Sequence, residues 1–273
     1  MYMPSRIEKQ KGGYMAELRN QTQKKYLLKF YVFMLMYIFM ALFILYLTFR
    51  FSFGYLSSGN SFSYRFTNAE FPENESFIVI IDAGHGGIDS GAVGIDDILE
   101  KNINLTISKK LEKLLNIANI EVIMTRTEDI MLDSDGATKR KASDLANRIR
   151  IVQKYPSALF ISIHMNKFPQ EKYKGLQVFY SVNNLGSANL ADIIKKNNKK
   201  YLQPDNNREI KRGKDIFILE KTNNCAVLIE CGFLSNHEEA RLLNSEEYQN
   251  KLSRILFISI LQYLGEENNK FIQ

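Results

Sequence analysis

The chain has 273 residues, of which 24% are charged and 45% are hydrophobic, and these proportions are ordinary for a globular protein. Its formal net charge is +6, but the first 29 residues hold seven Lys or Arg against two Glu and account for +5 of that charge. The rest of the chain is nearly neutral, so its charge gives no reason to expect binding to DNA or RNA.

Residues 30–49 form a stretch of twenty residues without a charged side chain. A helix of that length spans about 30 Å, enough to cross the hydrocarbon core of a bilayer. Because the basic arm of residues 1–29 precedes it, the positive-inside rule predicts a single-pass membrane anchor at Phe30–Phe49, with the N-terminus in the cytoplasm and everything after residue 50 outside it. A cleaved signal peptide is the alternative, although its apolar region is usually only about 7–15 residues. A buried core helix fits less well, because the segment is apolar on every face.

Residues 50–76 are rich in Ser, Asn, Gly and aromatic residues without a sustained period, which predicts a stalk or linker. From residue 77, apolar β-rich runs alternate with amphipathic helical stretches. The expected strands are 77–82, 120–125, 158–164, 176–181, 215–219 and 226–230, and the expected helices are 102–116, 137–154, 188–202, 238–243 and 245–264. This alternation predicts one α/β domain at 77–266, with a twisted, mainly parallel sheet of about six strands flanked by helices. The transmembrane helix precedes this domain, and a short C-terminal tail is expected at 267–273.

Two of the three histidines directly follow apolar, strand-like runs. His85 lies in the sequence Asp-Ala-Gly-His-Gly-Gly, and His164 ends the run Ile-Ser-Ile-His. The carboxyl ends of parallel strands are where α/β proteins build their sites. Glu100 lies near the start of the first expected helix, and two imidazoles with a carboxylate are the protein ligands of a catalytic zinc ion. Glu230, at the end of the last expected strand, suits a general base.

Each of these residues also has a simpler explanation. The glycine-rich turn around His85 is compatible with phosphate binding, but the Lys-Ser/Thr of a phosphate loop does not follow it. Taken singly, Glu100 fits a helix-capping carboxylate, and His164 fits a hydrogen-bonded core histidine. Glu230 is harder to explain in this way, because burying a carboxylate without a partner is costly. The third histidine, His237, is expected to be an ordinary loop residue.

Several segments share a family pattern in the same order along the chain: Asp82–Gly87, Glu100, Thr125-Arg126, Leu145–Arg148, Phe160–Asn166 and Leu228–Asn236. On these motifs, residues 78–264 resemble the zinc-dependent N-acetylmuramoyl-L-alanine amidases, a family of bacterial cell-wall hydrolases. The resemblance implies a single α/β domain with a mainly parallel sheet. It also implies that His85, Glu100 and His164 bind Zn²⁺ and that Glu230 is the catalytic glutamate.

The resemblance implies hydrolysis of the amide between the lactyl group of N-acetylmuramic acid and L-alanine of the stem peptide in peptidoglycan. The anchor and the lengthened connection at 133–141 are similar to the sporulation- and germination-specific subgroup, which strips peptides from spore-cortex muramic acid so that muramic δ-lactam can form. Whether a partner protein loads zinc or activates the enzyme stays open. Two other functions also stay open: an inactive, membrane-tethered wall-binding scaffold, and a zinc peptidase that acts on stem peptides.

Overall fold

The computed structural model describes residues 24, 25, 27, 29, 31–46 and 77–271. The chain divides into two units, Met1–Asn68 and Ala69–Gln273. In the first unit, residues 31–46 are helical and their side chains are exposed. No helix in the described part of the chain is long and apolar enough to cross a membrane. The expected anchor includes residues 30 and 47–49, which lie outside the described residues, as does the expected linker at 50–76, so both stay predictions.

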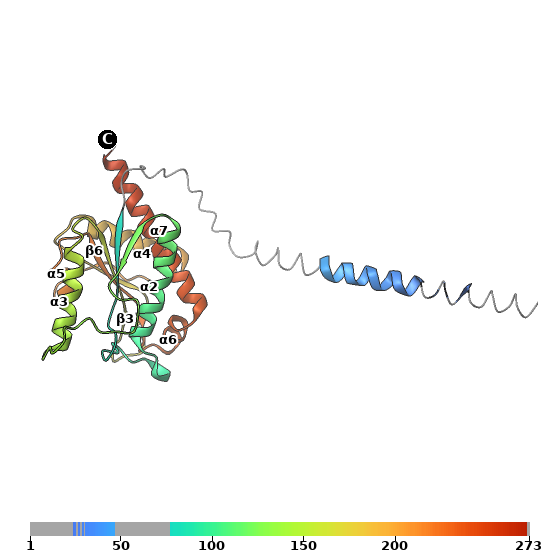
Figure 1. Cartoon of the computed structure of the whole chain (residues 1–273), viewed down its shortest axis with the longest axis horizontal. Helices are drawn as coiled ribbons and strands as arrows, with labels where there is room; N and C mark the ends of the chain where they lie inside the picture. The colour runs from blue at the N-terminus through green and yellow to red at the C-terminus, as the bar shows by residue number, and fades with distance from the viewer. Residues whose placement is uncertain (1–23, 26, 28, 30, 47–76, 272–273) are drawn as a thin grey trace, which may run out of the picture. The chain divides into compact units, whose positions relative to one another are not determined.

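The second unit is built on a six-stranded sheet with the order β2-β1-β3-β6-β4-β5. The strands are β1 (Ile78–Ala83), β2 (Glu121–Met124), β3 (Leu159–Asn166), β4 (Gln177–Tyr180), β5 (Lys211–Arg212) and β6 (Ala226–Phe233). The first four in the sheet order are parallel, β4 is antiparallel to β6, and β5 is parallel to β4. The mainly parallel sheet expected from the sequence is therefore confirmed (Figure 1).

Helices cover both faces of this sheet (Figure 1). One face carries α2 (Glu100–Ile117), α4 (Gly186–Tyr201), α6 (His237–Leu243) and α7 (Glu246–Phe271), and the other carries α3 (Arg140–Gln153) and α5 (Phe217–Glu220). A short 3-10 turn, η1 (Ile95–Asp97), precedes α2. In β3, Phe160 packs into the α3–α5 side and Ile161 and Ile163 pack into the other, because successive strand residues point to opposite faces. This two-sided burial explains why the strand is a continuous apolar run.

The strand expected at 215–219 is wrong. The chain forms a single helical turn there, α5, in which the amides of Leu219 and Glu220 donate to the Ile216 carbonyl. Ile218 and Leu219 are consecutive and both buried, and a strand would place them on opposite faces. A short apolar run does not distinguish these two structures. The strand that completes the six-stranded sheet is instead β5, which consists of two charged residues and has no recognisable sequence pattern.

Several elements extend beyond their expected ends, and β6 and α7 do so most clearly. β6 continues past Glu230 to Phe233, and its register with β3 shifts between the pairs His164–Glu230 and Asn166–Phe233, which marks a β-bulge. α7 continues to Phe271, so the described part of the expected tail is helical. Bulges often lie next to active sites, where they redirect side chains.

The strand order leaves a crevice for a functional site at the carboxyl ends of β1 and β3. From β1 the chain crosses to β2 on one side, while β3 lies on the other side of β1. The carboxyl ends of β1 and β3 therefore form a topological switch point, where a crevice opens in α/β sheets. His85 follows β1 directly, and His164 lies near the end of β3. Glu230 is the register partner of His164 on β6.

Candidate metal centre

Three of the predicted site residues meet at this switch point. His85 Nε2 and His164 Nδ1 lie 3.2 Å and 3.0 Å from the same Glu100 Oε1 atom, and the two ring centroids are 4.9 Å apart. One ligand atom from each residue lies within 4.8 Å of the others, so within the described part of the chain these side chains form a possible metal site. Two imidazoles and a carboxylate match the ligands of catalytic zinc sites, which keep a fourth position open.

Glu100 is buried and is oriented by backbone amides as well as by the histidines. Its Oε2 accepts the Ala92 N–H at 2.7 Å, and its Oε1 accepts the Met165 N–H at 3.0 Å. Burial raises the pKa of Glu100, but the hydrogen bonds and charges of His164 and His85 outweigh it and hold that pKa well below its usual range. The helix-capping explanation is not supported, because the backbone amides that Glu100 accepts belong to Ala92 and Met165, and its contact within α2 is with the Asn104 side chain at 3.3 Å.

Glycines allow the ligands to approach the backbone. A Cβ atom at Gly84 would lie 2.2 Å from His164 Cε1, and one at Gly91 would lie 2.5 Å from Glu100 Oε2. Gly91 also has a φ of +66°, which favours glycine. At both positions the missing side chain makes room for a ligand of the possible metal site.

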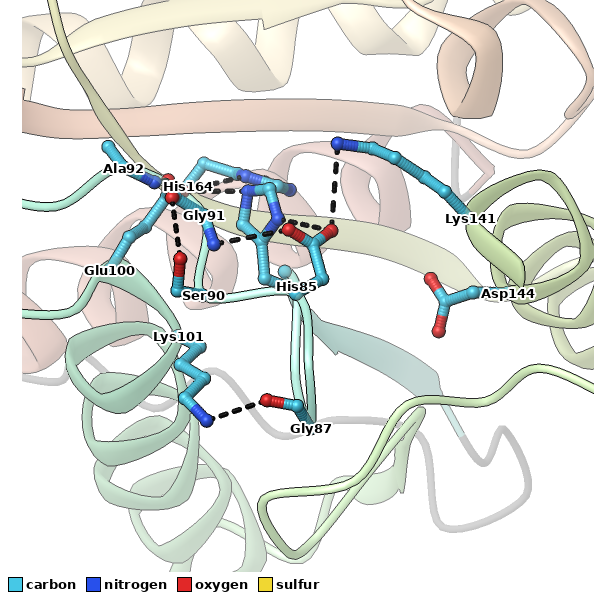
Figure 2. A network of polar contacts seen from close by, with 12 residues as sticks. His85, Gly87, Ser90, Gly91, Ala92, Glu100, Lys101, Lys141, Asp144 and His164 are labelled. Carbon is cyan, nitrogen blue, oxygen red and sulfur yellow. Dashed lines mark hydrogen bonds and ion pairs between the residues drawn. The ribbon is translucent and has the colours of Figure 1, made fainter. Parts of the chain in front are cut away.

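The Gly86 and Gly87 amides of the glycine-rich turn are already hydrogen-bonded within the protein. The Gly86 N–H donates to the Asp89 carbonyl at 3.0 Å, and the Gly87 N–H donates to Asp129 Oδ1 at 2.8 Å. Lys101 Nζ donates to the Gly87 carbonyl (Figure 2) and also to Asp129 Oδ2. A phosphate loop needs amides that point at the ligand, so the phosphate-binding interpretation is not supported by this turn.

His85 has a left-handed backbone with a φ of 61°, which is uncommon for a residue other than glycine. Gly86 and Asp89 pair through two backbone hydrogen bonds, and this tight turn brings Asp89 Oδ2 to 2.9 Å from His85 Nδ1. Lys141 Nζ lies 3.6 Å from the same carboxylate oxygen (Figure 2). Metal-binding histidines commonly donate their second ring N–H to such a carboxylate, which fixes the tautomer. Here that arrangement leaves Nε2 facing Glu100.

Two buried arginines hold the segment that carries His85. Arg126 Nε and Arg148 Nη1 both donate to the Ala83 carbonyl, at 2.8 Å and 2.9 Å. Arg126 also donates to the Gly84 carbonyl at 3.0 Å, and Arg148 donates to the His85 carbonyl at 2.8 Å. Each of these three successive carbonyls is therefore fixed by a planar guanidinium fork. We call these contacts the arginine clamp.

The charge of Arg148 is balanced by two carboxylates. Arg148 pairs with Asp82 at 2.5 Å and with Asp144 at 2.7 Å, and Asp82 also accepts hydroxyl hydrogen bonds from Ser162 and Thr125. Burial lowers the pKa of Arg148, but the two carboxylates outweigh it and raise that pKa above its ordinary value. Removing one partner of a buried ion pair typically costs about 3–5 kcal/mol, because a buried charge is left uncompensated.

Glu230 stands beside the possible metal site on the next strand. Because it pairs in register with His164, the two side chains lie on the same face of the sheet. The Glu230 side chain is partly exposed, but its Oε2 atom is buried and has no hydrogen-bond partner. Burial raises the pKa of Glu230 to about 7, with a further contribution from the charge of Glu100 and an opposing one from the histidines. A carboxyl group that titrates near neutral pH suits proton transfer.

The residues that support the site are difficult to recognise from the sequence. Asp144 and Arg148 have the i,i+4 spacing of a helical ion pair, which is a usable signal. Arg126 lies in one of the segments that carry the family resemblance, but the carbonyls that it contacts do not follow from the sequence. The Asp89–His85 contact depends on a tight turn and has no sequence signature. His237 is exposed at the start of α6 and takes no part in the cluster.

Replacing His164 with Ala removes one of the three candidate ligands, so we expect Zn²⁺ affinity to fall by about 100-fold or more. This loss exceeds the one expected from removing a group that only hydrogen-bonds to a ligand. Titration against a chelating dye, with elemental analysis, measures this change. His237→Ala is the matched control and should keep the affinity of the unmodified protein. Stoichiometric zinc in His164→Ala would contradict the ligand set.

Replacing Asp89 with Ala removes the outer carboxylate of His85, so we expect Zn²⁺ affinity to fall about 10- to 100-fold. The same titration measures it, and thermal denaturation of the metal-free protein checks the fold. Asp133→Ala is the control, because Asp133 pairs with Arg140 and lies outside the His85–Glu100–His164 cluster. Equal affinities in the two variants would show that Asp89 does not orient His85.

Comparisons with known proteins agree with this geometry. Residues 79–261 match the N-acetylmuramoyl-L-alanine amidase family. The germination-specific N-acetylmuramoyl-L-alanine amidase of Bacillus subtilis (strain 168) is 34% identical over 216 residues, which cover 76% of this chain and 90% of that protein.

Two solved structures are similar as well. The CwlD amidase from Clostridioides difficile, in complex with the GerS lipoprotein, is 41% identical with a TM-score of 0.67, and the match covers 69% of this chain and 98% of that one. The amidase AmiC2 of Nostoc punctiforme is 28% identical with a TM-score of 0.61, over 70% and 99% of the two chains. The chain therefore belongs to the N-acetylmuramoyl-L-alanine amidase family, with a germination-specific amidase among its relatives.

Proposed function

We propose that this enzyme uses Zn²⁺ to hydrolyse the amide between the lactyl group of N-acetylmuramic acid and L-alanine of the stem peptide in peptidoglycan. The observation that carries the proposal is the convergence of His85, Glu100 and His164 on one point, with Glu230 next to them on the adjacent strand. The donor set suits zinc, because it combines two imidazole nitrogens with an ionised carboxylate. The second carboxylate outside the ligand set supplies the base that hydrolysis requires.

The positions of the residues support a role for each. His85, Glu100 and His164 would hold a zinc ion, which would supply a Lewis acid for the scissile carbonyl and for the attacking water. Glu230 accepts the proton of the attacking water and returns it to the nitrogen of the leaving L-alanine. Its unpartnered Oε2 atom is an acceptor available for that proton. Asp89 orients His85, and the arginine clamp fixes the backbone on which His85 stands.

Product analysis tests the proposal. Purified protein with added Zn²⁺ is incubated with peptidoglycan, and mass spectrometry identifies the products. We expect intact stem peptides with a free N-terminal L-alanine alongside peptide-free muramic acid, and we expect chelation to abolish both. Cleavage between amino acids of the stem peptide would instead identify a zinc peptidase.

Replacing Glu230 with Ala should lower kcat by about 100-fold or more, in the range that general acid–base catalysis contributes. Zinc binding should persist, because Glu230 is not among the three ligands. The measurements are turnover on a soluble muramoyl peptide and zinc content, with Glu247→Ala as the control, because Glu247 is exposed on α7 and pairs with Lys251. Turnover of Glu230→Ala near that of the unmodified enzyme would remove Glu230 from the mechanism.

The pKa of Glu230, about 7 in the metal-free protein, sets the expected pH dependence. Glu230 accepts a proton only when it is ionised, so kcat/KM should fall as the pH decreases through that pKa. A bound cation favours the ionised form, which moves this acidic limb below pH 7. A pH–rate profile of the enzyme and of Glu230→Gln tests the assignment. An acidic limb that is unchanged in Glu230→Gln would assign it to another group.

We also propose that the reaction belongs to spore-cortex maturation, where peptide removal precedes formation of muramic δ-lactam. The similarity to a germination-specific amidase supports this role. Muropeptide analysis of cortex from spores that lack the enzyme tests it, and we expect muramic δ-lactam to be absent. A normal δ-lactam content would exclude the role.

A partner protein and a membrane anchor complete the proposal. A similar amidase was solved with a lipoprotein, which supports an activating partner of that kind for this enzyme. The uncharged stretch at 30–49 and the basic arm before it support an anchor with the catalytic unit outside the cytoplasm. Fractionation and protease accessibility of intact cells test the location, and pull-down with a tagged catalytic unit tests the partner.

A further inference from the structure

Arg208 is a partly buried arginine whose guanidinium hydrogen-bonds to a carbonyl and an amide oxygen, and whose charge also interacts with that of the buried Glu239. Its Nε donates to the Lys174 carbonyl at 2.8 Å, and its Nη1 donates to Gln177 Oε1 at 3.4 Å. The guanidinium carbon lies 4.5 Å from the centroid of the Phe233 ring. Arg208 forms no ion pair with any described residue, whereas Arg148 pairs with two carboxylates.

The register of the sheet places Arg208 near the catalytic centre. His164 pairs with Glu230, and Glu230 pairs with Gln177, so these three residues form a row across β3, β6 and β4. Because β4 is antiparallel to β6, its first residue, Gln177, lies at the edge where the parallel strands end. Adjacent strands are about 4.8 Å apart, so the Arg208 side chain, bonded to that of Gln177, lies roughly two strand spacings or 10 Å from Glu230.

A cavity of about 450 Å³ opens at Arg208, which is large enough for part of a peptide ligand. Its charged lining residues are Arg208, Lys172, Lys174, Asp205, Glu238 and Glu239. The two lysines are exposed and are offset by the exposed Asp205 and Glu238. Glu239 is buried and accepts the amides of Gly175 and Phe233. The cation with a fixed position in this cavity is therefore Arg208.

We propose that Arg208 binds a free carboxylate of the leaving stem peptide, at its second residue. This inference rests on the proposed function. A charge-assisted hydrogen bond to Arg208 takes up about 3 Å of the roughly 10 Å. The remaining distance of about 7 Å corresponds to the second residue beyond the scissile amide, because an extended peptide advances about 3.3–3.6 Å per residue. The second residue of a stem peptide is a γ-linked glutamate with a free α-carboxylate. The carboxylate formed on the lactyl group arises at the metal centre, so it is a different group.

The chemistry favours an arginine for this task. A guanidinium presents a planar fork to a carboxylate, and such charge-assisted hydrogen bonds are among the strongest in proteins. The ring of Phe233 and the Lys174 carbonyl already orient Arg208, so little conformational freedom is lost when the ligand binds. An isoglutamine at the same position has no charge and forms weaker bonds.

Peptide binding to the full chain tests the inference without hydrolysis. The probes are L-alanyl-γ-D-glutamyl-L-lysine and its isoglutamine analogue, and calorimetry or NMR titration measures their affinities. We expect the acid to bind about 10- to 100-fold more tightly than the amide, as hydrogen bonds to charged groups allow. Arg208→Gln should abolish this preference, and Arg212→Gln, on the exposed strand β5, should keep it. Arg208→Lys, which keeps the charge but not the fork, should keep part of it.

Equal affinity of the unmodified protein for the two peptides, or no binding of either at millimolar concentration, overturns the inference. If Arg208→Gln loses affinity equally for both peptides, Arg208 has a structural role, and this result also overturns the inference. If Arg208→Gln does not fold, Arg208→Lys and the unmodified protein decide the outcome. A lack of amidase products from muramoyl peptides counts against the proposed function and leaves this binding comparison unaffected.

Discussion

The arginine clamp is the constraint on which the candidate metal centre depends. The carbonyls of residues 83–85 follow β1 in succession, and Arg126 and Arg148 fix all three. His85 can hold its left-handed backbone because these contacts determine the conformation of its neighbours, and such strain persists only where the surroundings impose it. Within the clamp, Arg148 in turn depends on Asp82 and Asp144, since removing either carboxylate would leave part of its buried charge uncompensated. The ion pairs of Arg148 with Asp82 and Asp144 thus help to determine the direction of the His85 imidazole.

The four site residues differ in how they are supported. His164 and Glu230 are register partners on adjacent buried strands, so the backbone hydrogen bonds of the sheet fix their relation. Glu100 comes from the first turn of a helix, and His85 comes from a glycine-rich turn. The contacts that orient Glu100 and His85 are correspondingly more numerous, with amide, carboxylate and guanidinium groups around them. The side chains of a functional site keep an exact geometry only when surrounding hydrogen bonds and packing hold them in place.

The sequence was sufficient to place His85, His164 and Glu230 at one edge of a parallel sheet, because apolar runs followed by polar residues mark the ends of buried strands. It was also sufficient for the amphipathic helix that begins at Glu100. It was not sufficient for the single turn at Phe217–Glu220, whose short apolar run is compatible with a strand or a helix. The Asp89 contact and the Arg126 contacts were not predictable either, since they depend on the path of the backbone between distant segments. The assignment of Glu100 as a ligand rather than a cap required the position of His164.

The cluster of His85, Glu100 and His164 has a consequence for the whole catalytic unit. Glu100 and His164 lie 64 positions apart in the chain, and His85 belongs to a third segment, so an ion between them is a cross-link that closes long loops of polypeptide. Cross-links of this kind restrict the unfolded chain, and binding free energy adds to folding free energy when the unfolded chain lacks the site. If the proposed zinc ion binds there, metal supply would govern the lifetime of the protein together with its activity. The metal-free chain would then open more readily at the end of β1 and be degraded more easily.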